Sequence, residues 1–335
     1  MTAATTPPAG ATGVPTNRSS APGSASAATP GPHPDRSANE ASWRRRILGR
    51  QPIGMLLTAP YAVFIGVVFA FPLILAVWIS FHRYFFTAPG VSVPRPFVGF
   101  DNYKAALTDP AVLASFAHVG IFLIINGPLT VVFSLLLATA LNRGIRGRTF
   151  FRVAYYVPYV TASVAVVGVW LFLFSNTGLV NKVLGPLAPS PSWLVSSTWA
   201  LPLIAVFVTW KQLGFFILLY LAALQNIPKE LYESAATDGA SPTQAFLNVT
   251  VPGVRTSTGL VTLLAIITGA NLFTEPYLLT GGGGPAGAST SPVLLIYQKG
   301  IQQGNPDVAS AIGVILVVLV LIIALVNRWL SERGN

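Results

Sequence analysis

The chain has 335 residues, of which 53% are hydrophobic and only 9% are charged. Soluble domains carry a charge on about a quarter of their residues, so this composition excludes an ordinary soluble protein and indicates a membrane protein. The formal net charge of +10 does not indicate nucleic-acid binding, because the basic residues stand in short clusters beside apolar runs, as orientation in a bilayer requires. The absence of cysteine excludes disulfides, thiolate metal sites and cysteine nucleophiles.

The first segment, residues 1 to about 42, is rich in Ala, Pro, Ser, Thr and Gly and has no apolar core. Such a composition buries too little apolar surface to offset the entropy lost on ordering, which predicts a disordered tail. The segment also lacks the apolar stretch of a cleavable signal peptide. Residues 43–335 then form the expected transmembrane domain.

A helix that crosses the bilayer core needs about 20 mostly apolar residues. Six stretches satisfy this requirement, at roughly 53–80, 115–141, 153–175, 199–223, 256–280 and 308–330. We therefore expect an all-α membrane protein with six transmembrane helices. Membrane helices tolerate the prolines within these stretches, because neighbouring helices and hydroxyl groups can satisfy the freed carbonyls. The prolines favour static kinks over the alternative of gating hinges.

Lysine and arginine are distributed unequally between the two sides of the predicted membrane. The richer side holds Arg18, Arg36, Arg44, Arg45, Arg46, Arg50, Arg143, Arg146, Arg148, Arg152, Lys229, Arg255, Arg328 and Arg333. The poorer side holds Arg83, Arg95, Lys104, Lys182 and Lys299. Cytoplasmic loops carry the excess of positive charge, so both termini are predicted to be cytoplasmic, in agreement with an even number of spans.

The segment at 230–252, ELYESAATDGASPTQAFLNVTVP, is then cytoplasmic and reads as two short helices. Pro228 suits the first turn of the first helix, and Gly239 suits the left-handed position just past its end. Ser241 and Gln244 predict a capping box for the second helix.

This segment is acidic. Helices that lie on a membrane surface normally present Lys and Arg to anionic lipid. Glu230, Glu233 and Asp238 present carboxylates instead, which favours a protein partner over the alternative of a surface hairpin. Ala235 and Ala236 are small enough for another backbone to approach closely.

A glycine-rich segment on the predicted outer side offers no nucleotide site. Gly282 to Gly287 fits G-x-G-x-x-G, but it follows a transmembrane run rather than a strand. Its spacing also fits a P-loop, but Ala288 stands where lysine is required. The chain is therefore not expected to hydrolyse ATP itself. With no nucleophile–base pair and no histidines at metal-ligand spacing, neither a cofactor nor a metal is expected.

The motif Glu233-Ser234-Ala235, with Asp238-Gly239-Ala240, Val249 and Pro252, resembles the EAA loop of ABC importer permeases. Ser234 and Val249 are mild departures, since Ala and Ile are usual there. Other segments resemble the carbohydrate branch of that family, which includes the maltose and glycerol-phosphate permeases: FVGFDNYKAAL at 97–107, FFRVAYYVPYVTASVAVVGVW at 150–170, GLVNKVL at 178–184, LAALQNIP at 221–228 and LLTGGGGPAGAST at 278–290. The resemblance covers about residues 55–330.

The resemblance implies a type I ABC importer permease fold in a bacterial inner or plasma membrane, translocating a sugar or sugar derivative. The loop at about 225–255 is the implied coupling helix, which docks on a cytoplasmic ATPase through Glu233, Ala235, Ala236, Asp238, Gly239, Ala240 and Pro252. The implied partners are two ATPase copies, a second permease, an extracytoplasmic sugar-binding protein and membrane lipid, with no nucleic acid.

Two predicted spans carry candidate substrate-path residues, because the family places its substrate among the corresponding helices. They are Trp210, Lys211 and Gln212 in the fourth span and Asn271, Glu275 and Tyr277 in the fifth. Trp210 is expected to stack on the sugar, and Asn271 is expected to bind the hydroxyl groups of the sugar. An alternative for Lys211 and Glu275 is an ion pair that joins two helices, with Asn271 bridging backbone.

A secondary transporter driven by an ion gradient is the rival class. Such transporters usually bury titratable residues and show two related halves. Here only Lys211 and Glu275 lie within apolar spans, and no clear repeat is visible.

Overall fold

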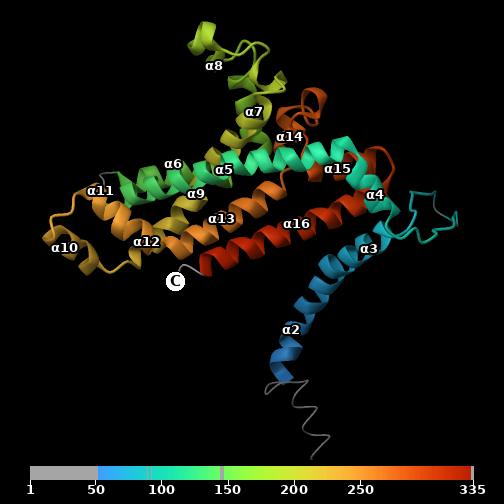
Figure 1. The fold of residues 1–335 in the computed structure, drawn as a ribbon, viewed down its shortest axis with the longest axis horizontal. Coiled ribbons are helices and arrows are strands. Elements are labelled where there is room, and N and C mark those ends of the chain that lie inside the picture. The colour runs from blue at the N-terminus through green and yellow to red at the C-terminus, as the bar shows by residue number, and fades with distance from the viewer. Residues whose placement is uncertain (1–51, 89, 92, 144–146, 333–335) are drawn as a thin grey trace, which may run out of the picture. The chain divides into compact units, whose positions relative to one another are not determined.

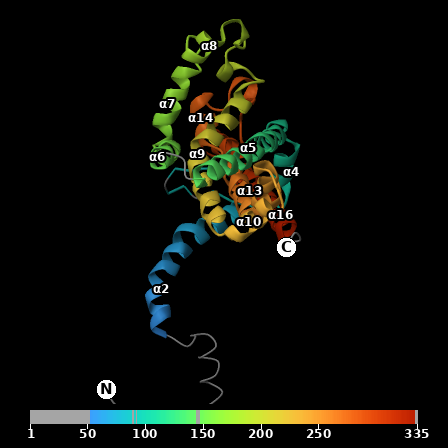
Figure 2. The ribbon, with the colours of Figure 1, turned by 90° about the vertical axis from the view of Figure 1, so that its left-hand side faces the viewer.

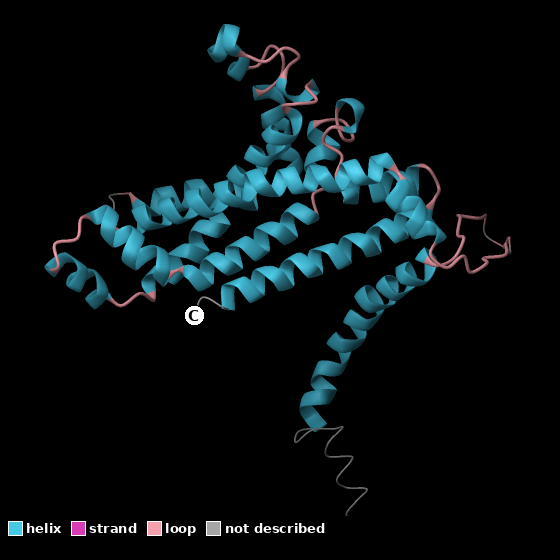
Figure 3. Ribbon diagram, viewed as in Figure 1, coloured by secondary structure: helices cyan, strands magenta, loops and turns pink. Residues whose placement is uncertain are grey.

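The computed structural model describes residues 52–88, 90–91, 93–143 and 147–332, so the predicted tail at 1–42 lies outside the described residues. Within them the secondary structure is helical, without strands (Figure 3). An isolated antiparallel bridge joins His82 to Phe97. The prediction of an all-α protein is confirmed. The chain divides into two units, Met1–Phe64 and Ile65–Asn335.

Most of the helices follow one another closely along the chain, and a longer connection covers residues 81–100. In chain order they are α2 (Pro52–Ile65), η1 (Gly66–Ala70), α3 (Phe71–Ser80), α4 (Asp101–Thr108), α5 (Pro110–Asn142), α6 (Arg148–Val160), α7 (Ser163–Leu173), α8 (Leu179–Leu184), η2 (Gly185–Leu187), η3 (Trp193–Val195), α9 (Ala200–Gln225), α10 (Lys229–Thr237), α11 (Pro242–Ala245), η4 (Phe246–Thr250), α12 (Val251–Gly253), α13 (Arg255–Ala270), α14 (Thr274–Leu279), η5 (Pro285–Gly287), α15 (Pro292–Tyr297), η6 (Gln298–Gln302) and α16 (Pro306–Glu332).

Several of these helices are long and apolar enough to cross a membrane. Among the described residues, four do so without a break: Leu56–Ser80, Pro110–Asn142, Ala200–Gln225 and Pro306–Leu330. Two bent pairs reach this length only together: Arg148–Val160 with Ser163–Leu173, and Pro242–Gly253 with Arg255–Ala270. The chain thus has four candidate spans, or up to six if each bent pair is one span.

Two of the predicted spans are broken helices. The stretch at 153–175 bends by 99° between α6 and α7, just after Pro158 removes one backbone N–H. The stretch at 256–280 stops at Ala270 and resumes as α14. Pro276 cannot donate to the carbonyl of Leu272, which instead accepts a hydrogen bond from the Ser291 hydroxyl. The sequence predicted kinks within continuous helices, whereas the structure has breaks at residues 161–162 and 271–273.

The larger unit is built around the packing of α5 on α9, with α13 packed on α5 and α16 packed on α13 (Figures 1 and 2). Bulky buried side chains fill this contact, among them Phe122, Phe207, Phe216 and Tyr220. α6 crosses α9 at Gly214, where an added Cβ would lie only 2.2 Å from the carbonyl oxygen of Tyr155. Glycine there lets two helix backbones touch, as membrane helix interfaces often require.

The remaining segments occupy distinct places around this bundle. The segment from α10 to α12 lies at one end of the long helices, and α4 and α15 lie towards the other end (Figure 1). The two restarted helices, α7 and α14, are in contact with each other and lie on the same side of α5 in both views (Figures 1 and 2). Each restarted helix begins a segment that leaves the bundle. We call these two segments, α7 with α8 and α14 with the glycine-rich segment, the excursions, and α7 and α14 bring them into contact.

Candidate functional site

The acidic segment forms the two short helices that its sequence predicts. Gly239 has φ +76°, and its N–H donates to the carbonyl of Ala236 at 3.1 Å while the N–H of Ala240 donates to that of Ala235 at 2.9 Å. This pair of bonds is a Schellman cap, which needs a left-handed residue. One detail differs from the prediction, because Pro228 is the N-cap of α10 and not a residue of its first turn.

The second helix of the segment begins with the predicted capping box. The N–H of Ser241 donates to Gln244 Oε1 at 2.7 Å, and the N–H of Gln244 donates to Ser241 Oγ at 3.3 Å. Pro252 lies in α12, immediately before the 68° bend into α13. The segment is therefore a helical hairpin with capped ends, as the sequence predicts.

α10 presents its acidic side chains to the outside of the chain. Glu230, Glu233 and Asp238 are exposed and line a hollow of about 340 Å³ together with Ser234 and Thr237. On the opposite side, Tyr232 packs against the core, and its hydroxyl contacts Thr250 Oγ1 at 3.0 Å.

The space around the turn of this hairpin is open. A Cβ added at Gly239 meets no atom within 4 Å, so the constraint there is the backbone conformation and not crowding within the chain. Of the neighbouring residues, Ala236 is exposed and Ala235 half-buried. The acidic face and the turn are therefore both accessible from outside the chain.

Lys211 and Glu275, predicted as path residues or as an ion pair, are paired. Lys211 Nζ lies 3.0 Å from Glu275 Oε1, and both residues are buried. Lys211 Nζ also donates to Ser163 Oγ at 2.7 Å. A charge within a membrane span is costly unless it is paired, so the geometry agrees with the alternative of a helix-joining ion pair. Ser163 was not singled out from the sequence, because no local signal links it to Lys211.

The predicted aromatic residues of the path lie in two separate clusters. The Trp210 ring, which is 41% exposed, packs 5.6 Å from that of Trp170. The Tyr277 ring stacks on Phe273 at 5.4 Å and meets Tyr297 edge-on at 5.8 Å. Each cluster contains a partly exposed candidate ring, Trp210 at 41% and Tyr277 at 37%.

The polar candidates of the path differ in their surroundings. Asn271 is exposed, and its Nδ2 donates to the carbonyl of Ile267 at 2.7 Å, as the backbone-bridging alternative requires. That bond leaves the Oδ1 oxygen of Asn271 as an acceptor. Gln212 is half-buried on α9.

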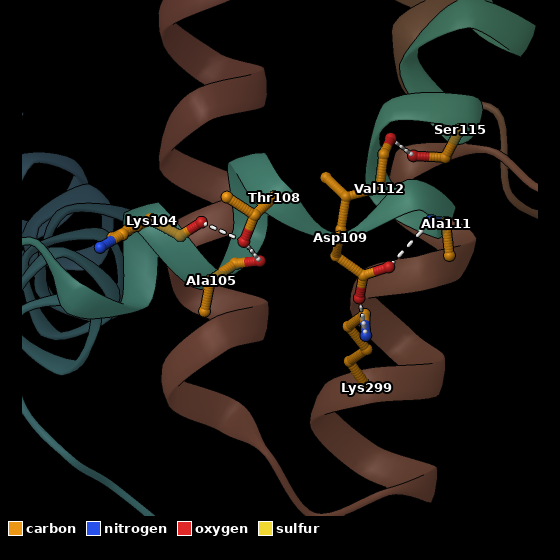
Figure 4. A network of polar contacts seen from close by, with 8 residues as sticks. All are labelled: Lys104, Ala105, Thr108, Asp109, Ala111, Val112, Ser115 and Lys299. Carbon is orange, nitrogen blue, oxygen red and sulfur yellow. Dashed lines mark hydrogen bonds and ion pairs between the residues drawn. The ribbon is translucent and has the colours of Figure 1, made fainter.

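A second ion pair, which the sequence did not predict, joins two segments far apart in the chain. Lys299 Nζ lies 2.6 Å from Asp109 Oδ2, and Asp109 Oδ1 accepts from the N–H of Ala111 at 2.8 Å (Figure 4). The hydrogen bond from Lys299 lowers the pKa of Asp109 below its usual value, with burial opposing. The Asp-Pro sequence signals a helix N-cap, but nothing local identifies Lys299 as its partner.

The glycine-rich segment folds back on the protein. The N–H groups of Gly282 and Gly283 donate to the carbonyl of Pro276 at 3.3 and 3.1 Å, which caps α14. The carbonyl of Gly283 accepts from the N–H of Ser289 at 2.8 Å. The N–H groups of Gly282 and Gly283 are thus used in hydrogen bonds within the chain.

Comparison with known proteins identifies the family. Residues 130–333 match the family described as binding-protein-dependent transport system inner membrane component. The chain is 31% identical over 298 residues to the arabinooligosaccharides transport system permease protein AraP of Bacillus subtilis, covering 88% of this chain and 93% of that protein. The chain belongs to the binding-protein-dependent transport system inner membrane component family.

Further relatives support the carbohydrate branch of this permease family. The sn-glycerol-3-phosphate transport system permease protein UgpA of Yersinia pestis is 30% identical, with 83% of this chain and 93% of that protein covered. The trehalose/maltose transport system permease protein MalF of Thermococcus litoralis is 32% identical, with 80% and 90% covered. The predicted resemblance to the maltose and glycerol-phosphate permeases is confirmed.

A solved structure shares the fold of this permease. A chain of a bacterial alginate ABC transporter, in complex with an alginate pentasaccharide-bound periplasmic protein, superposes with a TM-score of 0.70 at 22% identity, covering 86% of this chain and 97% of that one. The predicted type I importer permease fold is confirmed. These relatives give no support to a secondary transporter, and membership of a transport family agrees with the prediction of a non-enzymatic subunit.

Proposed function

We infer that the chain is a permease subunit of an ATP-driven ABC importer that carries a sugar or sugar derivative into the cytoplasm. The relatives named above are sugar or glycerol-phosphate permeases, and each covers at least 80% of this chain. One observation carries the proposal: the exposed acidic hairpin has both the residue spacing of an EAA loop and a glycine in the left-handed region at its turn.

The hairpin at about 225–255 is the proposed coupling loop to the ATPase. Its contact residues are Glu233, Ala235, Ala236, Asp238, Gly239, Ala240 and Pro252. Support comes from the exposed carboxylates, whose sign suits a basic protein groove better than an anionic membrane surface. ATP hydrolysis then takes place on a separate subunit, present in two copies.

The proposed membrane topology rests on the positive-inside rule. Both termini and the hairpin lie in the cytoplasm, residues 43–335 form the membrane domain, and the membrane is a bacterial inner or plasma membrane. The other partners are a second permease and an extracytoplasmic sugar-binding protein, which delivers the substrate.

The proposed substrate path uses the exposed aromatic faces of Trp210 and Tyr277 and the polar groups of Gln212 and Asn271. Sugars are held by stacking on aromatic rings and by side-chain hydrogen bonds. Lys211 and Glu275 are paired with each other, so they act on the path through the position of the helices rather than as direct ligands.

The proposed function is tested by measuring which energy source drives uptake. The chain is purified in mild detergent, and the subunits that co-purify are identified, reconstituted and supplied with ATP and a sugar-loaded binding protein. Uptake should require ATP and survive an uncoupler. Uptake that the uncoupler abolishes while ATP stays high would show an ion-gradient transporter instead.

The substrate path is tested with Trp210→Ala and Asn271→Ala, with Leu218→Ala on an exposed position of α9 as the control. A lost aromatic face or hydrogen bond is worth about 1 kcal/mol or more, so sugar uptake should fall several-fold or change selectivity. Assembly and ATPase stimulation by the docked binding protein should persist. Unchanged uptake kinetics in both variants would place the path elsewhere.

A further inference from the structure

The starting observation is that one buried ammonium group contacts the first turns of two restarted helices. Ser163 is the first residue of α7, which follows the 99° bend after α6. Glu275 is the second residue of α14, which follows the break after α13. Lys211 Nζ, on the unbroken helix α9, donates to Ser163 at 2.7 Å and to Glu275 at 3.0 Å.

The Lys211 cluster is defined as Lys211, Glu275 and Ser163; its two charged residues are buried, and Ser163 is half-buried. The side chains of Lys211 and Glu275 are each 11% exposed. The Phe207 ring lies 5.9 Å from Lys211 Nζ. In such surroundings a charge-assisted hydrogen bond is short and directional, and an unpaired partner is costly.

The cluster lies where backbone hydrogen bonds do not fix the helix directions. Across a break in a helix, the i→i−4 ladder is interrupted, so the angle between the two parts depends on side-chain contacts. α7 leads to α8, and α14 leads to the glycine-rich segment, so both restarted helices carry segments on the predicted outer side. α7 and α14 also contact each other.

We propose that Lys211 is a positioning residue that locks α7 and α14 to α9, and so holds the two outer excursions of the permease in one relative position. This inference rests on the proposed function for its role in transport, where the outer segments face the binding protein. Directional bonds are needed for this role, whereas a packing role requires only that the volume be filled.

Paired substitutions separate positioning from packing. Lys211→Met or Glu275→Gln alone removes one member of a buried pair and should lower the Tm. The double variant Lys211→Met with Glu275→Met removes both charges, so it should recover most of the Tm, because apolar replacement of a buried pair is often neutral or stabilising. The double variant still lacks the hydrogen bonds from Lys211 to Ser163 and Glu275. The relative position of the two excursions should therefore remain variable in it. Leu218→Met on the same helix is the control.

The position of the excursions is measured directly. Because the native chain has no cysteine, Thr177→Cys and Pro285→Cys, both at exposed positions, accept spin labels cleanly in the purified complex in nanodiscs. The wild-type pair and the Leu218→Met control should give one narrow distance distribution. Lys211→Met and the double variant should give a broad or shifted distribution, and Ser163→Ala a smaller change of the same kind.

Transport gives the second readout. The double variant should lose about tenfold or more of binding-protein-stimulated uptake while keeping its Tm, since a displacement of about 1 Å can remove that much activity. A double variant with a wild-type distance distribution would overturn the proposal and leave the Lys211 cluster a packing element. The distance measurement needs no substrate, so this result stands apart from any failure of the proposed function.

Discussion

At the scale of single residues, backbone conformation and side-chain chemistry can be separated at the turn of the acidic hairpin. Gly239 adopts φ +76° and has open space where a Cβ would lie. A non-glycine residue in this conformation costs about 1 kcal/mol, and Asn and Asp tolerate it better than other residues. Substitutions at this position therefore leave the isolated chain folded and affect the surface offered to a partner.

Gly239→Asp and Gly239→Asn form a matched pair of the same shape that differs in charge. Both should insert normally into the membrane. The aspartate variant, which adds a carboxylate beside Glu233 and Asp238, should lose ATPase association and uptake, and the asparagine variant should show a smaller loss. Co-purification and uptake are the measurements. Wild-type uptake in the aspartate variant is incompatible with a coupling role for this turn.

Asp109 offers a pH-dependent contribution to stability. Its pKa lies below the unfolded value of 3.8, chiefly through the hydrogen bond from Lys299. A lowered pKa contributes stability that is present above pH 3.8 and is lost as the pH falls through the folded pKa. The contribution of such a partly exposed pair is small, about 1 kcal/mol or less.

Asp109→Asn keeps a good N-cap residue and removes the ion pair, whereas Asp109→Ala removes both. At pH 7 the asparagine variant should lose up to about 1 kcal/mol, and the alanine variant about 1 kcal/mol more through the lost cap. The difference between wild type and the asparagine variant should shrink as the pH falls below 3.8. Thermal unfolding across pH measures this, and a difference that does not vary with pH would contradict it.

At the scale of elements, the helices of the larger unit are held together by close crossings as well as by large apolar side chains. The crossing of α6 on α9 has no room for a Cβ at Gly214, whereas Gly120 on α5 has open space around it. Residues 161–162 interrupt the helix between α6 and α7, and residues 271–273 interrupt it between α13 and α14. The crossing and the breaks together fix the path of the chain in this region.

Gly214→Ala should therefore separate α6 from α9 and lower the stability by about 1–3 kcal/mol, as overpacking does. Gly120→Ala is the control, and it should be neutral or slightly stabilising because alanine is the better helix former. The two Tm values in detergent give the comparison. Equal Tm values would mean that the crossing is looser than the structure indicates.

At the scale of the whole molecule, the open question is which face of the membrane each segment occupies. The positive-inside rule puts the acidic hairpin in the cytoplasm and the segment between α7 and α9 outside. Single cysteines report this cleanly, since the chain has none of its own. Ser192 is only 9% exposed, whereas Pro285 is exposed, so a cysteine at Pro285 is the more accessible probe of the outer side.

Cysteines at Ser192 and Pro285 should react with an impermeant thiol reagent added from outside, and a cysteine at Thr243 should react only after the membrane is opened. Labelling of the opened membrane is the control for accessibility at each position. The reverse pattern would invert the topology and remove the basis for a cytoplasmic coupling loop.

The sequence by itself determined the features that depend on local chemistry. Composition and apolar runs predicted a helical membrane protein, and residues 228–252 predicted a hairpin whose cap, turn and capping box all appear in the structure. Caps and turns are set by a few neighbouring residues, so short motifs are sufficient to predict them. The EAA spacing and the segments around it likewise indicated the permease family.

Only the tertiary structure decided how distant residues meet. The sequence offered Lys211 and Glu275 either as path residues or as a pair, and packing brought them to 3.0 Å with Ser163 as a third member. It also joined Asp109 to Lys299 and interrupted the predicted spans at 153–175 and 256–280. Such contacts depend on crossing angles and on where a proline interrupts a helix, and these follow from the packing of the whole bundle rather than from any local pattern.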